Sequence, residues 1–443
     1  MSSIVENLDN TLSGLAADGE SPARYVIAFS GGIDSTVLLH AMCRSHLSIP
    51  VLVAHVDHQL CAESAQWEAH CRNVAESLGV DYVSEPARIA ADSGMGPEAA
   101  ARAARYEVFE NILQANDWLL TAHHEADQAE TLLLNLFRGS GPSGLAAMKI
   151  SRPFATGRLV RPLLRTPKEQ IDDYARQENL VWIQDPTNVD TRFNRNFLRN
   201  DILPLLESRW QALTGRLTRS AELAGEAAHL LDDLAGMDLE TAGTTDKLNI
   251  GVLARLTPAR QRNLLRYAIR ELGLPSPPST RLSQIVDELM LAREDAQPLV
   301  QWPGVEVRRY RDRIYLLSTG LSSTIAETDD LLRVGASAYL GSGLGTLSLS
   351  ESGGAGIDPA IATSGLKIRI RDGGESIQPV GRNHAHKLKK LLQEAAIVPW
   401  MRSRIPLLFS GDKLVAVADL WVAADCSGEN GYQIRWENRP AIT

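Results

Sequence analysis

A short loop rich in glycine and hydroxyl side chains carries the clearest chemical signal in this sequence. Ser30-Gly31-Gly32-Ile33-Asp34-Ser35 follows an apolar run, Arg24–Phe29, and precedes a helical stretch. The glycines let the backbone approach an anion, and amides at a helix start face it with the positive end of the dipole. Glycine pairs also occur in plain strand-to-helix turns. The two added hydroxyls favour a phosphate site made by Ser30, Gly31, Gly32, Ile33, Asp34 and Ser35.

The loop differs from the Walker type in a way that limits its chemistry. A Walker loop carries Gly-Lys-Ser/Thr, whereas Asp34 and Ser35 stand at that place here. Cleavage of a terminal phosphate is therefore disfavoured. Because a carboxylate repels a triphosphate unless a divalent cation lies between them, Asp34 predicts Mg²⁺ together with ATP.

A second cluster, His123-His124-Glu125-Ala126-Asp127-Gln128-Ala129-Glu130, follows the apolar run Trp118–Thr121. Asp127 and Glu130 are three residues apart, so on a helix they share a face, where they could hold Mg²⁺ or a substrate ammonium group. We expect Asp34 and Asp127 as metal ligands, and these two with Glu130 as catalytic residues. The plain alternative for the histidines is hydrogen bonding to the backbone at a strand end.

The elements that position both clusters follow an alternating pattern over the first two hundred residues. Alternation of strands and helices predicts an α/β fold with a parallel sheet, and such sheets bind ligands at the strand ends. Thr166-Pro167-Lys168-Glu169 predicts a capping box that starts a further helix. The expected strands are Arg24–Phe29, Val51–Val56, Asp81–Val83 and Trp118–Thr121, and the expected helices are Ser35–Arg44, Ser64–Leu78, Pro97–Gln114 and Asp127–Phe137.

The remaining chain predicts two further domains. Residues 213–237 are rich in helix formers, 248–292 also indicate helices, and Val305–Leu317 alternates like a hairpin. Leu366–Glu437 mixes strand runs with one helix near His386–Glu394, which is typical of a small α+β domain. We therefore expect a catalytic domain at 1–212, a mostly helical middle domain at 213–320, a linker that could carry a few strands at 321–364, and a C-terminal domain at 365–443.

Composition excludes several classes of protein. The net charge of −9 argues against a protein that coats nucleic acid, although basic residues outnumber acidic ones between Lys367 and Arg404. The sequence has neither an apolar run that could cross a bilayer nor a secretory start, which predicts a cytoplasmic protein without membrane contact. Its four cysteines are dispersed without a Cys-x-x-Cys pair, so neither a zinc clip nor a disulfide framework is expected.

The glycine loop resembles the PP-loop of the N-type ATP pyrophosphatases, which cut ATP between the α and β phosphates. Motifs along almost the whole chain resemble those of the bacterial tRNA(Ile)-lysidine synthetases. One departure is Ala126, where many members carry an acidic residue. The motifs are Ser30–Ser35, His55–Leu60, Glu98–Arg102 with Arg105-Tyr106, His123–Thr131, Arg138–Gly141, Arg161–Leu163, Asp185–Asn188, Arg195–Arg199, Val380–Arg382, Lys387–Lys390 and Arg404–Leu408.

This resemblance implies a specific reaction. The substrates would be isoleucine tRNA with anticodon CAU, free L-lysine and ATP. The O2 atom of the first anticodon cytidine would attack the α-phosphate and release pyrophosphate. The lysine ε-amine would then attack C2 and expel AMP, which gives lysidine and changes codon reading and charging from methionine to isoleucine.

The resemblance also implies roles for further residues. Asp127 or Glu130 could act as the base for the lysine amine. We expect tRNA contacts from Arg195, Asn196 and Arg199, for which a solvated helix face is the alternative. Further tRNA contacts are expected from Arg382, Lys387, Lys389 and Lys390. Substrate contacts are expected from Glu98, Arg102, Arg105 and His123.

Two other functions fit part of the pattern. A thiolation-type PP-loop enzyme would keep the loop, but such enzymes carry sulfur on cysteines or an iron–sulfur cluster, and the dispersed cysteines speak against that. A non-catalytic ATP-sensing RNA-binding protein would not need Asp34, Asp127 and Glu130. The sequence leaves the oligomeric state open, with a homodimer as one possibility.

Overall fold

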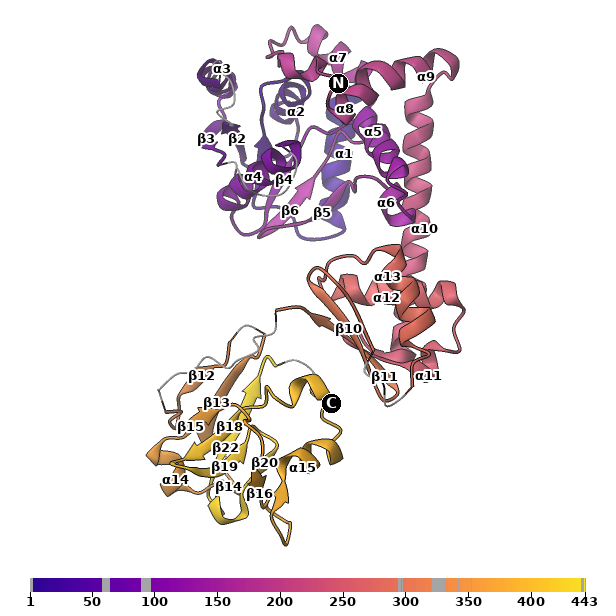
Figure 1. Ribbon diagram of the computed structural model, residues 1–443. Helices are drawn as coiled ribbons and strands as arrows, with labels where there is room; N and C mark the ends of the chain where they lie inside the picture. The colour runs from indigo at the N-terminus through magenta and orange to yellow at the C-terminus, as the bar shows by residue number, and fades with distance from the viewer. Residues whose placement is uncertain are drawn as a thin grey trace. The chain divides into compact units, whose positions relative to one another are not determined.

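The computed structural model divides into two compact units, Met1–Leu230 and Leu231–Thr443 (Figure 1). Among the described residues, no helix combines the length and apolar character that a bilayer-spanning segment needs. The structure describes residues 3–57, 64–88, 97–293, 296, 298–320, 331–341, 343–351, 353–439 and 442.

The N-terminal unit is built on a six-stranded sheet in the order β3-β2-β1-β4-β6-β5, in which only the β5–β6 pair is antiparallel. The four strands expected from the sequence are present. The hairpin of β5 and β6 was missed, because its runs are short and weakly apolar. The strands are β1 (Arg24–Ala28), β2 (Val51–Asp57), β3 (Asp81–Pro86), β4 (Asp117–Leu120), β5 (Ser151–Phe154) and β6 (Gly157–Val160).

Helices cover both faces of this sheet, because successive side chains of a strand point to opposite sides. In β1, Tyr25 and Ile27 pack with α1, α2 and α7, whereas Val26 packs with α4 on the other face. This is the α/β arrangement that the alternating pattern predicted. The helices are α1 (Ser3–Ala17), α2 (Ile33–Cys43), α3 (Ser64–Ser77), α4 (Pro97–Ile112), α5 (Glu125–Phe137), α6 (Pro142–Leu145), α7 (Lys168–Gln177), α8 (Asn194–Phe197) and α9 (Leu203–Arg209).

The start of α7 differs from the expected capping box. Pro167 is itself the cap residue, with an extended ψ of 143°, and no side chain caps the helix. Thr166 is buried, and its carbonyl accepts a hydrogen bond from the Glu125 amide at 3.1 Å. The backbone of Thr166 is therefore hydrogen-bonded to the start of α5. The helix after Thr166 is present as expected, but the capping-box prediction was wrong.

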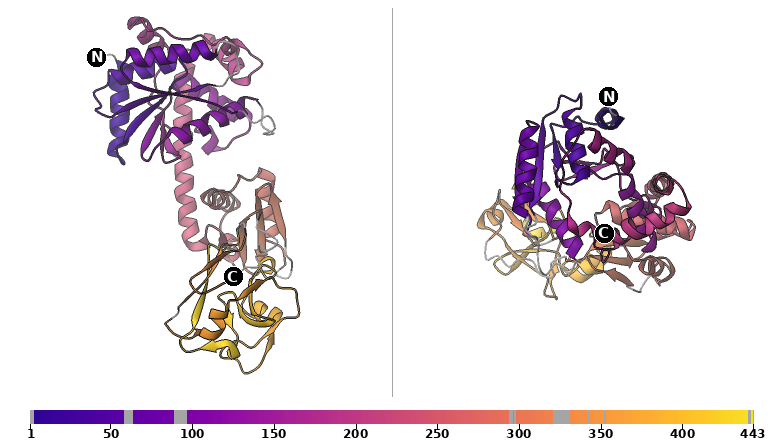
Figure 2. Two further views of the ribbon diagram at one scale, coloured as in Figure 1. Left: turned by 90° about the vertical axis from the view of Figure 1, so that its left-hand side faces the viewer. Right: turned by 90° about the horizontal axis from the view of Figure 1, so that it is seen from above.

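The 30-residue helix α10 (Leu213–Ala242) is continuous (Figure 2). The middle segment is helical as expected, and it also forms a five-stranded sheet that includes the predicted hairpin of β10 and β11. Its elements are β7 (Gly243–Thr244), β8 (Lys247–Asn249), β9 (Leu299–Trp302), β10 (Val305–Tyr310), β11 (Arg313–Ser318), α11 (Ile250–Leu253), α12 (Pro258–Glu271) and α13 (Ser279–Gln284).

In its described residues the C-terminal part contains small antiparallel sheets and short helices, in agreement with the expected α+β domain. The stretch 321–364, expected as a linker, holds β12, β13, β14 and α14 in its described part, and β13 pairs with β22 along six residue pairs. The elements are β12 (Ser337–Tyr339), β13 (Thr346–Glu351), β14 (Gly356–Ile357), α14 (Pro359–Ser364), β15 (Lys367–Arg369), β16 (Ser376–Ile377), β17 (His386–Lys387), α15 (Leu388–Glu394), β18 (Leu407–Ser410), β19 (Lys413–Val417), β20 (Trp421–Val422), β21 (Ser427–Gly428) and β22 (Tyr432–Glu437).

Candidate active site

The glycine loop connects β1 to α2 and is held by its own hydroxyl groups. The Ser35 hydroxyl donates to the Gly32 carbonyl at 2.9 Å and lies 3.1 Å from the Ser30 hydroxyl. Gly31 has a φ of 78°, and a Cβ there would lie 2.7 Å from Ile183 Cδ1 and 2.9 Å from the Cys71 Sγ. The site therefore requires glycine both for its backbone conformation and for lack of space.

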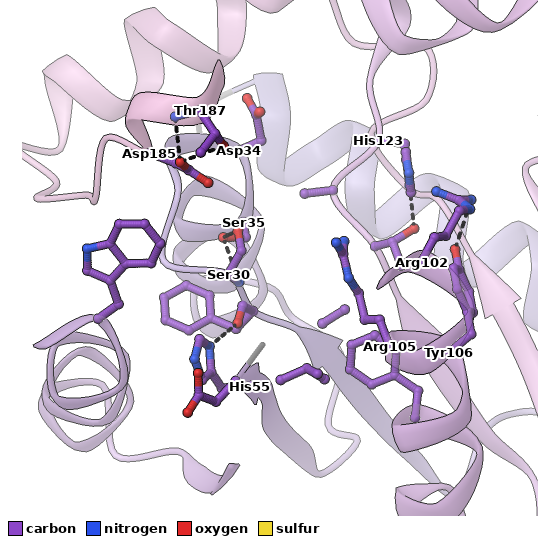
Figure 3. Close-up of a pocket in the computed structure, with 18 of the residues that line it drawn as sticks. Ser30, Asp34, Ser35, His55, Arg102, Arg105, Tyr106, His123, Asp185 and Thr187 are labelled. Atoms are coloured by element: carbon purple, nitrogen blue, oxygen red, sulfur yellow. Dashed lines mark hydrogen bonds between the residues drawn. The ribbon is translucent and has the colours of Figure 1, made fainter. Parts of the chain in front are cut away.

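A pocket of about 450 Å³ opens beside this loop, entirely within the N-terminal unit (Figure 3). The strand order places β1 between β2 and β4, so the loops after β1 and β4 leave the sheet at the point where its connections diverge, the usual ligand crevice of such sheets. The loop residues Ser30, Asp34 and Ser35 therefore share the pocket with His123 and Asp127. The volume lies within the range of small-molecule sites.

The carboxylates of α5 form a buried cluster with two arginines from the helical turns after residue 193. Glu130 is fully buried, and its oxygens accept from Arg195 Nε at 2.7 Å and from Arg199 Nε at 2.6 Å. One oxygen of Asp127 accepts from both Arg195 and Arg199 at 2.9 Å, and the other accepts from the His124 amide. Two carboxylates can be buried together here because two guanidinium groups neutralise them.

Asp34 lies at the start of α2 and has two cationic neighbours from other elements. Lys168 Nζ, on α7, donates to one of its oxygens at 2.6 Å, and His124 Nε2 lies 3.7 Å from the other. Burial favours the protonated acid, but His124 and Lys168 outweigh it and lower the pKa of Asp34. Asp34 is thus held as a carboxylate at the edge of the pocket.

The pKa values of the two histidines of the second cluster shift in opposite directions. Burial lowers the pKa of His123 to about 3, even though Asp127 opposes the shift. Burial also acts against protonation of His124, but hydrogen bonding to Asp34 and the charge of Asp127 raise its pKa. His124 is buried and lies 3.6 Å from Asp127 as well as close to Asp34, so it bridges the two predicted catalytic aspartates.

The other residues expected to contact substrate or tRNA lie in different surroundings. Arg102 and Arg105, from α4, line the pocket, and Arg102 lies over the Tyr106 ring at 5.0 Å (Figure 3). Glu98 falls outside the residues whose side chains the structure describes. Asn196 instead stabilises a turn, since its amide donates to the carbonyls of Thr187 and Asp190 at 2.9 and 3.0 Å.

Arg195 and Arg199, for which tRNA contacts are expected, turn their guanidinium groups to the carboxylates of α5. In the C-terminal part, Arg382 is ion-paired with Glu394 at 2.9 Å, and Lys390 lies 3.9 Å from the same carboxylate. Lys387 and Lys389 are exposed.

Sequence reasoning missed several residues of this site. The sequence offers backbone hydrogen bonding as the plain alternative for His124, includes Lys168 only in the expected capping box, and assigns no individual role to Asp185 and Thr187, which line the pocket. His124, Asp185 and Thr187 lie in motifs that carry the family resemblance, whereas Lys168 lies in none of them. The contacts themselves join elements far apart in the chain.

The parallel sheet and its glycine loop define the N-terminal unit as a PP-loop domain, and a family model of that description matches residues 4–206. Models described as the TilS substrate binding domain and the TilS substrate C-terminal domain match residues 248–315 and 366–436. The chain belongs to the tRNA(Ile)-lysidine synthase family.

Its relatives match over nearly their whole length. The tRNA(Ile)-lysidine synthase of Coxiella burnetii is 41% identical over 419 residues, which cover 94% of this chain and 92% of that protein. The one of Alkalilimnicola ehrlichii is 42% identical over 416 residues, covering 93% and 92%. The expected family is thus confirmed, and neither a thiolation enzyme nor a non-catalytic ATP sensor is favoured.

Proposed function

We propose that this enzyme ligates L-lysine to the first anticodon cytidine of isoleucine tRNA with anticodon CAU, at the cost of one ATP cleaved to AMP and pyrophosphate. The observation that carries the chemistry is the pocket in which the phosphate loop, Asp127 and neutral His123 meet. Membership of the lysidine synthase family supplies the acceptor.

In the first step, cytidine O2 forms a bond to the α-phosphorus and the bond to the bridging oxygen breaks, with its electron pair leaving on pyrophosphate. The glycine loop would hold the pyrophosphate. The Ser30 and Ser35 hydroxyls bond to each other and to the Gly32 carbonyl, so they would exchange these internal bonds for phosphate oxygens. Arg102 and Arg105 add positive charge on the α4 wall of the pocket.

The carboxylates at this pocket suit a Mg²⁺ ion that binds together with the phosphates of the substrate. Mg²⁺ commonly binds through one or two carboxylates together with substrate phosphates. The Asp34 carboxylate is part-exposed at the pocket, and the oxygen that does not pair with Lys168 lies 3.7 Å from His124 Nε2. Both oxygens of Asp127 already accept hydrogen bonds. We therefore assign Asp34, and not Asp127, as the protein ligand, and a bound Mg²⁺ would neutralise phosphate charge.

In the second step the lysine ε-amine forms a bond to C2 while the bond from C2 to the adenylated oxygen breaks and AMP leaves with the electron pair, and the amine nitrogen gives up one proton to solvent water. Asp127 lines the pocket, but its pKa is lowered because His124, Arg195, His123 and Arg199 outweigh the effect of burial. A carboxylate with a low pKa is a weak base, but it keeps its negative charge at neutral pH. Asp127 is accordingly a counterion for a cationic group, and Glu130 positions the arginines beside it.

Contacts to tRNA away from the anticodon are assigned to the exposed C-terminal lysines. Lys387 and Lys389 stand next to Arg382 and Lys390 in sequence and on the surface of the same small domain. Exposed lysines contact phosphates without reading base sequence, which suits recognition of tRNA shape.

The full chain, incubated with ATP, magnesium chloride, radiolabelled lysine and a transcript of isoleucine tRNA bearing CAU, should incorporate lysine into that RNA. A methionine tRNA transcript with the same anticodon serves as the matched control and should stay unlabelled. Absence of label in the isoleucine transcript, with the protein folded, contradicts the proposed function.

A further inference from the structure

The glycine loop lacks the lysine by which Walker loops grip phosphates, yet a lysine reaches the loop from elsewhere in the fold. Lys168, at the start of α7, lies 134 residues beyond Asp34 in sequence, and its Nζ donates to the Asp34 carboxylate at 2.6 Å. It is the cation nearest to Asp34 among the described residues. Its side chain keeps 32% of its surface exposed, so it is not locked inside the core.

Packing of α7 against α2 fixes where this ammonium group stands. Ile171 and Tyr174 of α7 are buried in the same core as the apolar residues of α2. The Tyr174 hydroxyl is hydrogen-bonded to His40 Nδ1 on α2 at 2.9 Å. Because α2 is also the helix that starts at the phosphate loop, the position of Lys168 relative to the loop is set by a rigid contact between two helices.

The lysine has a second carboxylate partner that does not belong to the loop. Lys168 Nζ lies 3.0 Å from Asp172, one helical turn further along α7. The ammonium group therefore contacts two carboxylates, that of Asp34 at the site and that of Asp172 on its own helix. Three rotatable N–H donors on a flexible stem allow it to exchange one acceptor while keeping the other.

We propose that Lys168 is a phosphate-binding residue of the PP-loop site, which neutralises Asp34 in the free enzyme and moves to the oxygens of the pyrophosphate half of ATP when the loop is occupied. Asp172 keeps the ammonium group at the site during this exchange. When the bond between the α-phosphorus and the bridging oxygen breaks, Lys168 lies beside the leaving group that receives the electron pair. The inference rests on the proposed function, because it requires that ATP place its pyrophosphate in this loop.

The test measures binding of inorganic pyrophosphate to the full chain by titration calorimetry, with magnesium chloride present. K168Q keeps a hydrogen-bonding group next to Asp34 but removes the charge, and it should weaken pyrophosphate binding by roughly 10- to 100-fold, the loss of one charge-assisted hydrogen bond. K168R should recover part of this affinity because it restores the charge. R176M, an exposed ion-pair member on the same helix, is the matched control and should bind like the wild type.

A kinetic measurement separates binding from chemistry. In lysine incorporation, K168Q should raise KM for ATP and lower kcat, since the same contact holds the nucleotide and stabilises the leaving group. Pyrophosphate affinity equal to that of the wild type in folded K168Q overturns the assignment of Lys168. If the wild type itself neither binds pyrophosphate nor incorporates lysine, the proposed function fails instead, so the two failures are distinguishable.

Discussion

The cluster of Glu130 with two arginines gives the sharpest single test of how this site is built. In Glu130→Gln the side chain keeps its shape but loses its charge, and its amide N–H faces guanidinium donors in place of an acceptor. Three hydrogen bonds, at 2.6, 2.7 and 3.0 Å, connect the present carboxylate to Arg195 and Arg199. If Glu130 positions these arginines, the change lowers the stability of the N-terminal unit as well as activity.

The magnitude follows from burial. Removing one member of a fully buried ion pair costs about 3–5 kcal/mol. Arg195 and Arg199 are 24% and 38% exposed and keep their bonds to Asp127, so we expect a cost below that range, about 2–3 kcal/mol. For a unit of this size about 1 kcal/mol corresponds to roughly 2–4 °C, which predicts a decrease in Tm of roughly 4–12 °C.

Thermal unfolding followed by calorimetry measures the stability, and lysine incorporation measures the activity of the same preparations. Asp173→Asn is the matched control, because the Asp173–Arg176 pair is exposed on both sides and should change Tm by no more than about 1–2 °C. A Glu130→Gln protein with the Tm of the wild type but without activity would refute the positioning role and return Glu130 to direct contact with substrate.

Three further outcomes are expected. Gly157→Ala should lower the free energy of unfolding in urea by about 3 kcal/mol or more, since its Cβ would lie 1.9 Å from the Asp117 carbonyl oxygen between β4 and β6. Gly14→Ala, in open space on α1, is the control and should raise it by about 0.5–1 kcal/mol. Equal effects of the two changes would contradict the close packing of Gly157 against Asp117. The pKa of His123 falls to about 3 on folding, so below its ordinary pKa of 6.5 the unfolded chain binds a proton that the folded chain does not. The wild type should therefore lose stability relative to His123→Gln as the pH falls from 7 to 5. A stability difference that does not change with pH would disprove the lowered pKa of His123. Replacing three C-terminal lysines by alanine should reduce the slope of log affinity for tRNA against log salt by about 2–3, and replacing them by arginine should not; an unchanged alanine slope counts against their phosphate contacts. These lysines are Lys387, Lys389 and Lys390.

The parts of the fold that the sequence predicted are those with strong local signals. The strand at Arg24–Phe29 and the loop after it combine apolar residues, paired glycines and hydroxyls within twelve residues. The hairpin of β5 and β6 and the small strands of the middle segment escaped prediction, because short runs depend on pairing partners rather than on local preference. The capping box at Thr166 is absent because Pro167, and not Thr166, is the residue at the start of α7.

The sequence by itself determined the chemistry of the phosphate loop, the absence of a Walker lysine and the family, because these depend on residue type and short spacing. Only the tertiary structure decided which charges face each other. It turned Arg195 and Arg199, 65 and 69 residues beyond Glu130, onto that carboxylate, and it brought Lys168 to Asp34 across 134 residues. An ion pair forms where packing of helices and strands brings two groups within about 4 Å, and no local pattern encodes that distance.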